Sequence, residues 1–226
     1  NRLTGLTERV SVNSSGLEGT YVALPGNPSD APDISGDGRF VVYRSFASDL
    51  VSGDTNGVKD IFVRDRLLGT TTRVSVSSSG AEAAFPVSVT PDQRYPSISA
   101  GGKVVVFCSN ANNLVPGDDN STYDVFAHNL QTGITERISI ASDGTEGSDV
   151  SVISGISPDG RYVAFTSWAD NRVPNDTNHW RDSFLHDRMT GGPALSLSNV
   201  VAGQTATFGV SGASPGGLVF VGISLV

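Results

Sequence analysis

Cysteine, methionine and long apolar runs are nearly absent from this chain. Its one cysteine, Cys108, cannot form an internal disulfide or a cysteine-rich metal site, and we interpret it as a buried thiol within a strand. No apolar run is long enough to span a bilayer, and no segment repeats its apolar residues at helical spacing. A signal-peptide pattern is missing from the first residues. With 26 glycines and abundant valine, serine and threonine, the composition predicts an all-β protein.

Positive charge is also scarce. The chain has 15 lysine and arginine residues against 23 aspartate and glutamate residues, which gives a formal net charge of -8. Lys59 and Lys103 are its two lysines, and neither lies in a basic cluster. Such a surface repels phosphate groups, so we expect no nucleic acid as a partner and no attraction to anionic lipids.

A long segment occurs three times. It begins with GDGRFVVYRS at Gly36, with AGGKVVVFCS at Ala100 and with PDGRYVAFTS at Pro158, so the copies lie 64 and then 58 residues apart. A repeat of this length indicates a series of similar structural units. We place the repeat region at residues 1–192 and its units at about residues 30–78, 95–141 and 153–190.

Each unit predicts four short antiparallel strands. In the first unit they are PDIS, RFVVYRS, DIFVRD and TTRVSV, with a glycine-containing tight turn after the first. The second strand is almost wholly apolar, as expected of an inner strand covered on both faces, and the fourth alternates with polar residues, as expected of an outer strand. Four-stranded units in series are typical of propeller blades. The predicted fold is therefore a propeller-like array of three four-stranded antiparallel blades.

The third unit, ISPDGRYVAFTS followed by DSFLHDRMTGG, resembles the TolB-type or PD40 (WD40-like) β-propeller repeat of bacteria. A closer resemblance is to an extracellular variant with units such as AxNLVPGDTNxxxDVFVRDxxTGxTxRVSV, and it covers roughly residues 1–192. The resemblance implies a propeller fold and export from the cell, hence an extracellular or cell-surface location. It does not imply a reaction.

The two ends of the repeat region do not match. TERVSV at Thr7–Val12 is a fourth strand with no unit before it, whereas no such strand follows DRMTGG in the third unit. Three blades are too few to close a ring. Two chains could form a six-bladed ring, the chain could be a fragment of a longer protein, or the orphan strand could complete the open blade of the next subunit. The last alternative predicts a homo-oligomer or, where the contact does not close, a filament.

Residues 193–226 predict a short C-terminal β segment of three alternating strands separated by glycine-rich turns. The segment resembles the start of an Ig-like or secretion-tail β-domain, but three strands are too few for an independent sandwich. Two explanations remain open, namely truncation of a longer chain and pairing of these strands with another subunit.

A short segment with the pattern D-x-N-x-x-x-D, here called the acidic phrase, recurs in the loop between the second and third strands of every unit. Its oxygen-bearing side chains, two and six positions apart, could surround a hard cation such as calcium, to which Asp49, Asn113 and Asn171 could add an oxygen. They could instead cap turns by bonding to backbone amides, and their recurrence in every unit favours an architectural role. The candidate residues are Asp54, Asn56, Asp60, Asp118, Asn120, Asp124, Asp176, Asn178 and Asp182.

Nothing in the sequence predicts a catalytic residue. G-x-S-x-G, P-loop and dinucleotide-binding motifs are missing, and no pair of loop carboxylates stands out as acid and base. His128 and His186 occupy matching places in third strands, which favours a packing role. Calcium is the one cofactor for which the sequence offers ligands.

Aromatic residues in the third unit suggest a ligand surface. Trp168, His179 and Trp180 flank one loop and could bind glycans or a protein partner, and the alternative is local packing. Three segments also match the N-glycosylation pattern. These sequons begin at Asn13, Asn120 and Asn175.

Three functions are compatible with these patterns. The first is a non-catalytic extracellular structural protein whose subunits join by intermolecular strand pairing into a filament or surface layer. The second is a cell-surface module that binds glycans or proteins. The third is an enzyme with its site in the blade loops, for which no residue is a clear candidate.

Overall fold

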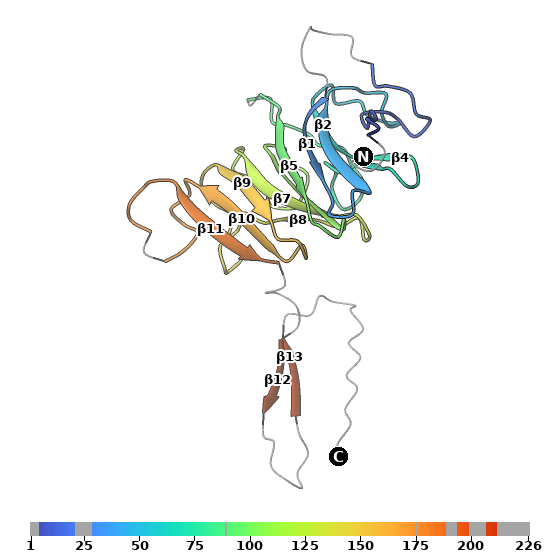
Figure 1. Cartoon of the computed structure of the whole chain (residues 1–226). Coiled ribbons are helices and arrows are strands. Elements are labelled where there is room, and N and C mark those ends of the chain that lie inside the picture. The colour runs from blue at the N-terminus through green and yellow to red at the C-terminus, as the bar shows by residue number, and fades with distance from the viewer. Residues whose placement is uncertain are drawn as a thin grey trace, which may run out of the picture. The chain divides into compact units, whose positions relative to one another are not determined.

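The computed structural model describes residues 5–20, 29–88, 90–174 and 176–188, and the strands at 194–198 and 207–211 (Figure 1). The chain divides into two compact units, Asn1–His186 and Asp187–Val226. The described residues form strands, turns and loops without a helix, so the prediction of an all-β fold is confirmed. No helix among them is long and apolar enough to cross a membrane.

Two four-stranded antiparallel sheets correspond to the first and second repeats. In each sheet every strand pairs with the next one along the chain, as predicted for propeller blades. The first sheet consists of β1 (Ser29–Ile34), β2 (Phe40–Ser45), β3 (Asp60–Asp65) and β4 (Thr70–Arg73). The second sheet consists of β5 (Gln93–Ile98), β6 (Val104–Ser109), β7 (Asp124–Asn129) and β8 (Thr135–Arg137).

The third sheet has three strands within the described residues, in the order β11, β10, β9. They are β9 (Ser151–Ile156), β10 (Tyr162–Ser167) and β11 (Asp182–Asp187). The segment Thr7–Val12, predicted as an orphan strand, belongs to none of the sheets, and Val12 forms one isolated bridge with Glu18. Two blades are thus four-stranded and the third is three-stranded in the part of the chain that the structure describes.

The fourth strand is shorter than the predicted TTRVSV. The amide of Ile61 donates to the Ser75 hydroxyl at 3.0 Å instead of to a backbone carbonyl, so the ladder between β3 and β4 ends at this serine. Ser139 accepts from Val125 in the same way at the end of β8. After each serine the chain turns into a small hairpin that returns to a glutamate, Glu82 or Glu146.

The second compact unit contains one hairpin of described residues. Strand β12 (Ala194–Ser198) pairs antiparallel with β13 (Thr207–Ser211). These are two of the three strands predicted for the C-terminal segment, and the third lies outside the described residues, as does the predicted boundary between residues 192 and 193. The likeness to an Ig-like domain stays a prediction.

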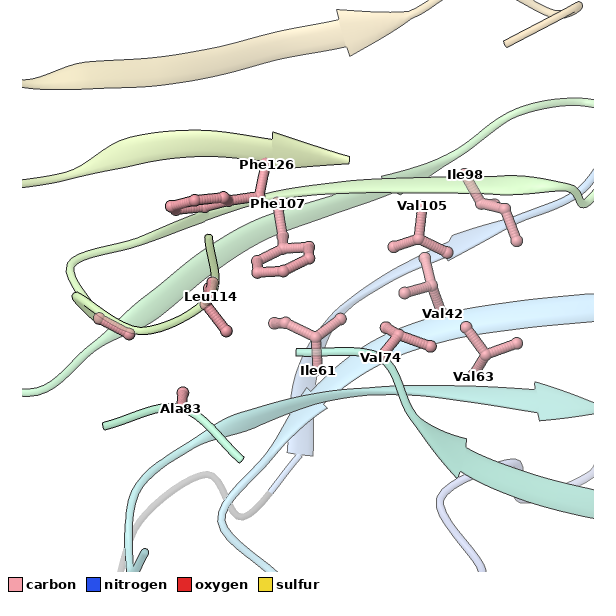
Figure 2. Close-up of a cluster of buried hydrophobic side chains, with 11 residues drawn as sticks. Val42, Ile61, Val63, Val74, Ala83, Ile98, Val105, Phe107, Leu114 and Phe126 are labelled. Carbon is pink, nitrogen blue, oxygen red and sulfur yellow. The ribbon is translucent and has the colours of Figure 1, made fainter. Parts of the chain in front are cut away.

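Apolar side chains fill the space between successive sheets. Between the first two sheets, Figure 2 shows Val42, Val63 and Val74 of the first repeat facing Ile98 and Val105 of the second. A second cluster, with Val106 and Ile138 on one side and Ile153 and Val163 on the other, joins the second sheet to the third. Burial on both faces explains why the inner strands are almost continuously apolar.

Candidate functional site

An arginine lies among the carboxylates of the first acidic loop. Atom Nη1 of Arg73, from the end of β4, is 3.3 Å from both Asp54 Oδ1 and Asp60 Oδ2. The same atom is 3.0 Å from Glu82 Oε2, and all four side chains are largely buried. A guanidinium group therefore supplies the positive charge at the position where the sequence offered ligands for a metal ion.

The second loop repeats this arrangement. Arg137 Nη1 is 3.6 Å from Asp118 Oδ1 and 3.8 Å from Asp124 Oδ2, and it forms an ion pair with Glu146. The oxygen atoms of the three acids lie within 4.8 Å of one another, the one such group of three in the part of the chain that the structure describes. Arg172 Nη2, from the third unit, lies 3.8 Å from Asp124 Oδ1. The two guanidiniums leave a net charge of about -1 when all three acids are ionised, so calcium binding stays a prediction for this cluster.

The asparagines of the acidic phrase stabilise turns. Asn56 accepts a hydrogen bond from the amide of Val58 at 3.1 Å, and its side-chain nitrogen donates to Asp60 at 3.1 Å. Asn120 and Asn178 make the same two bonds to the corresponding groups of their own loops. A donor nitrogen that faces the aspartate cannot coordinate a cation, so the asparagine geometry corresponds to the turn-capping alternative in all three units.

Burial changes the protonation of the loop aspartates. It raises the pKa of Asp54 to about 6 and that of Asp118 to about 7, and the neighbouring carboxylates of Asp60 and Asp124 add to the rise. Burial also raises the pKa of Asp60 and Asp124. The clusters therefore become more negative as the pH rises through these values.

The glutamates of these clusters lie outside the residues predicted from spacing. Glu82 accepts from the amide of Thr55 at 3.0 Å, and Glu146 accepts from the amide of Asp119 at 3.3 Å, so each glutamate also holds the acidic loop in place. The signal was available, because Glu18, Glu82 and Glu146 follow the fourth-strand motif at a constant interval of 64 residues. It went unnoticed because the glutamates lie beyond the predicted strands, in the hairpins.

Three further loop residues, suggested as additional metal ligands, instead connect successive units. Asn113 accepts from the amide of Ala84 at 2.7 Å and donates to the carbonyl of Glu82 at 2.9 Å, both in the hairpin of the preceding unit. Asn171 binds the hairpin of the second unit in the same way, and Asp49 accepts from the amide of Thr20 at 2.8 Å. These residues fasten each loop to the unit before it.

The acidic loop of the third unit differs from the other two. Asp176 and Asp182 are partly exposed, whereas Asp60 and Asp124 are fully buried. The bond from Asn178 to Asp182 is present, so the turn itself forms. No arginine from a fourth strand joins this loop within the described residues.

A hairpin near the start of the described residues carries the groups that the third loop lacks. Arg9 forms an ion pair with Glu18, as Arg73 does with Glu82. The Arg9 side chain is 60% exposed, however, whereas that of Arg73 is 9% exposed. Within the described residues, the third acidic loop thus has no fourth-strand arginine, and the hairpin with Arg9 contacts no acidic loop of this kind.

The aromatic residues predicted as a ligand surface lie in one loop region of the third unit. The guanidinium of Arg181 lies 5.0 Å from the ring centre of Trp168, and His179 Nδ1 is 2.6 Å from Asp170 Oδ2. The hydrogen bond to Asp170 raises the pKa of His179. Trp180 is 76% exposed and Trp168 is 41% exposed, so the Trp180 indole is the more accessible of the two.

Two of the three sequons lie among the described residues. The Asn13 side chain caps its own turn by accepting from the amides of Ser15 and Leu17, each at 3.0 Å. The side-chain nitrogen of Asn120, which would carry a glycan, donates to Asp124 at 2.9 Å. Asn175 lies outside the described residues. Glycosylation at these positions stays a prediction.

The remaining nucleophilic and titratable candidates are packed into the blades. Cys108 is buried in β6, as predicted, and burial raises the pKa of its thiol to about 12. His128 is buried, with its Nδ1 atom 2.8 Å from Thr135 Oγ1, and burial lowers the pKa of its imidazole. Neither group is both accessible and activated, as a nucleophile or base would be.

Some solved structures are similar to this chain. TolB from Acinetobacter baumannii is 18% identical over 71% of this chain and 30% of its own, with a TM-score of 0.43. Putative TolB from Agrobacterium tumefaciens is 18% identical over 66% of this chain and 41% of its own, with a TM-score of 0.39. The β-propeller domain of the Trilobed protease from Pyrococcus furiosus is 12% identical over 80% of this chain and 52% of its own, with a TM-score of 0.43.

The TolB proteins that the repeat motif resembles are thus among the similar solved structures. This chain spans less than two thirds of the length of each of the three. No family model and no curated protein matches the chain. Identities and TM-scores this low give no conclusion about activity.

Proposed function

We propose that this chain is a non-catalytic assembly module that acts outside the cell, where copies join through the edges of their sheets into a filament or surface layer. The observation that carries the proposal is the open face of the third blade. Leu185 of β11 is 68% exposed, whereas Val63 and Ala127 at the matching positions are 4% and 0% exposed. Burying one such leucine in a contact stabilises that contact by about 1.5–3 kcal/mol.

The form of the acidic loops supports a structural role over a catalytic one. Each complete cluster contains an arginine that pairs with its carboxylates, and the same cluster recurs in successive units. A catalytic site needs one acid and one base in different environments at one place. Repeated and internally paired clusters instead hold loops and hairpins together.

Self-association is tested by sedimentation velocity and electron microscopy of the purified chain from about 1 to 200 μM, a range that spans typical affinities of subunit contacts. We expect sedimentation coefficients to rise with concentration and elongated or ring-shaped particles to form. A protein that stays monomeric over the whole range contradicts the proposal.

Binding of glycans is a second candidate, which the exposed indole of Trp180 favours. A flat aromatic ring beside the paired groups His179 and Asp170 can stack on a sugar and offer it hydrogen bonds. We expect a glycan panel to give a signal that Trp180→Ala abolishes and that Leu67→Ala, which removes another exposed apolar side chain, retains. Equal signals for both variants, or none for the wild type, contradict this candidate.

A further inference from the structure

The arginine hairpin and the open third blade are complementary halves of one repeat. Arg9, Ser11 and Glu18 precede Arg73, Ser75 and Glu82 by 64 residues each, so they match the groups that complete the first acidic loop. In the third unit the matching acidic residues, Asp176 and Asp182, lie in the loop that lacks these groups. The inference developed from this match rests on the assembly proposed above.

One side of the hairpin is already packed on its own chain. The Thr71 hydroxyl donates to the carbonyl of Val12, and the Thr71 amide donates to Ser14 Oγ at 3.0 Å. Thr135 makes the same two bonds to the hairpin of the first unit. The hairpin at residues 9–18 therefore sits on the first blade as the hairpin of the first unit sits on the second.

The other side of the hairpin is open. Val74 and Ser75 are 0% exposed because β3 of their own unit covers them, whereas Val10 and Ser11 are partly exposed. Beside Val10 lies a groove of about 700 Å³, lined by residues of the arm at 6–10 and of the first blade. Its apolar lining includes Ile34, which is 54% exposed, whereas the matching Ile98 is 6% exposed.

The complete junction between the first two blades shows what would fill this groove. There Val74, Ile98 and Val105, which match Val10, Ile34 and Val41 of the groove, form one cluster with Val42 and Val63 (Figure 2). The groove therefore lacks the two side chains at the positions of Val42 and Val63. In the third blade these positions are occupied by Ala164 and Leu185, and both residues are exposed.

We propose that β11 of a second copy enters the groove beside residues 6–10, so that the arm becomes the fourth strand of that copy's third blade. Leu185 and Ala164 then pack against Ile34 and Val10, and Arg9 reaches the acidic loop of Asp176 and Asp182. The apolar contacts with Ile34 reproduce those between the first and second units of a single chain. The contacts of Arg9 reproduce those that Arg73 makes within the first unit. The contact joins unlike surfaces, so its repetition gives a filament or a ring.

The repeat fixes the register of this contact. Thr72 lies opposite Val63 and Glu136 lies opposite Ala127 in the complete blades. By the same pairing, Glu8 lies opposite Leu185 of the second copy. Directly opposite Cβ atoms are about 4.5–5.5 Å apart, close to disulfide geometry, whereas diagonal neighbours are about 7–8 Å apart.

Cysteine pairs test the register in the full chain. We expect Glu8→Cys combined with Leu185→Cys to form a ladder of disulfide-linked multimers on mild oxidation, at least about tenfold faster than Glu8→Cys combined with Ser183→Cys, which is displaced by two residues. A mixture of the two single variants Glu8→Cys and Leu185→Cys gives a mixed dimer and no ladder. Cys108 stays in place because it is buried.

Charge reversal tests the role of the arginine. Arg9→Glu replaces the cation by a fourth acid beside Asp176, Asp182 and Glu18. We expect it to weaken association by about a hundredfold or more, as expected when a buried ion pair is broken. Lys103→Glu makes the same change in charge on the exposed residue that precedes β6, and we expect it to change association by less than about twofold. Circular dichroism of both variants checks that they fold.

The outcomes separate this inference from the proposed function. Suppose that the wild type assembles but Arg9→Glu assembles equally well, or the displaced cysteine pair crosslinks as fast as the matched pair. Either result retains the proposed assembly and shows that the arm is not the contact. If the wild type does not assemble at all, both proposals are wrong.

Discussion

The second and third units contain the same acidic phrase in different surroundings. In the second unit Asp118 and Asp124 are buried around Arg137, whereas Asp176 and Asp182 of the third unit are partly exposed. The asparagine turn forms in both. The phrase alone therefore shapes its own turn. Its carboxylates are buried where the arginine at the end of the fourth strand and the glutamate of the following hairpin join them.

Removal of the central arginine is the strongest test of this difference. Arg137→Met removes the cation that pairs with Asp118 and Glu146 and leaves only Arg172 beside Asp124. We expect the free energy of unfolding to fall by about 3–5 kcal/mol at pH 7.5. Arg9→Met, the matched change on an exposed arginine, lowers it by less than about 0.5 kcal/mol in monomeric protein. Urea unfolding at low protein concentration measures both values, and equal losses contradict the distinction between the hairpins.

A smaller effect is expected from the aspartate that begins the third strand. Asp124→Ala removes the acceptor of hydrogen bonds from Ser139 and Asn120 in a buried site, and should cost about 2–3 kcal/mol. The same change at the partly exposed Asp182 should cost less than about 1 kcal/mol. If urea midpoints shift equally for the two variants, burial does not decide the contribution of this position.

The dependence on pH sharpens the comparison. The pKa of Asp118 is about 7 in the folded chain, above its unfolded value, so the folded state binds the proton more tightly. The resulting stabilisation is complete at low pH and is lost as the pH rises through 7. We expect wild-type stability to decline relative to Asp118→Asn by about 2 kcal/mol between pH 5 and 8. If the free energies of unfolding of the two proteins, measured with urea, change equally between pH 5 and 8, this would falsify the raised pKa of Asp118.

Calcium should give the smallest effect. If the charge remaining on Asp118, Asp124 and Glu146 binds an ion, 5 mM calcium should raise Tm by about 2–4 °C relative to a chelator, about the shift that binding of the folded state alone produces. Glu146→Gln should remove this difference, and Asp176→Asn should retain it. Identical melting curves for wild type with calcium and with chelator rule out the metal at this cluster.

Much of the fold was predictable because the repeat gives each strand three times. The tight turn before Phe40, the apolar inner strands and the phrase ending at Asp60 all lie where the sequence placed them. The end of the fourth strand was not predictable from alternation, because the Ser75 hydroxyl stops the ladder through a contact distant in sequence.

The acidic site was only half predictable. Spacing identified Asp54, Asn56 and Asp60, and capping chemistry correctly suggested how the asparagine is used. The arginine that pairs with them comes from the next strand, and Glu82 comes from the hairpin beyond it. Residues from three segments meet only after the sheet has formed, so spacing within one loop cannot show the complete cluster.

The bonds from Asp49, Asn113 and Asn171 back to the preceding hairpin have a consequence for folding cooperativity. Each of these bonds joins adjacent units, so the free energy of the array is close to a sum of terms between adjacent units. Local opening should then start at the outermost blade and progress inward, with hydrogen exchange fastest in β11 and slowest in β6.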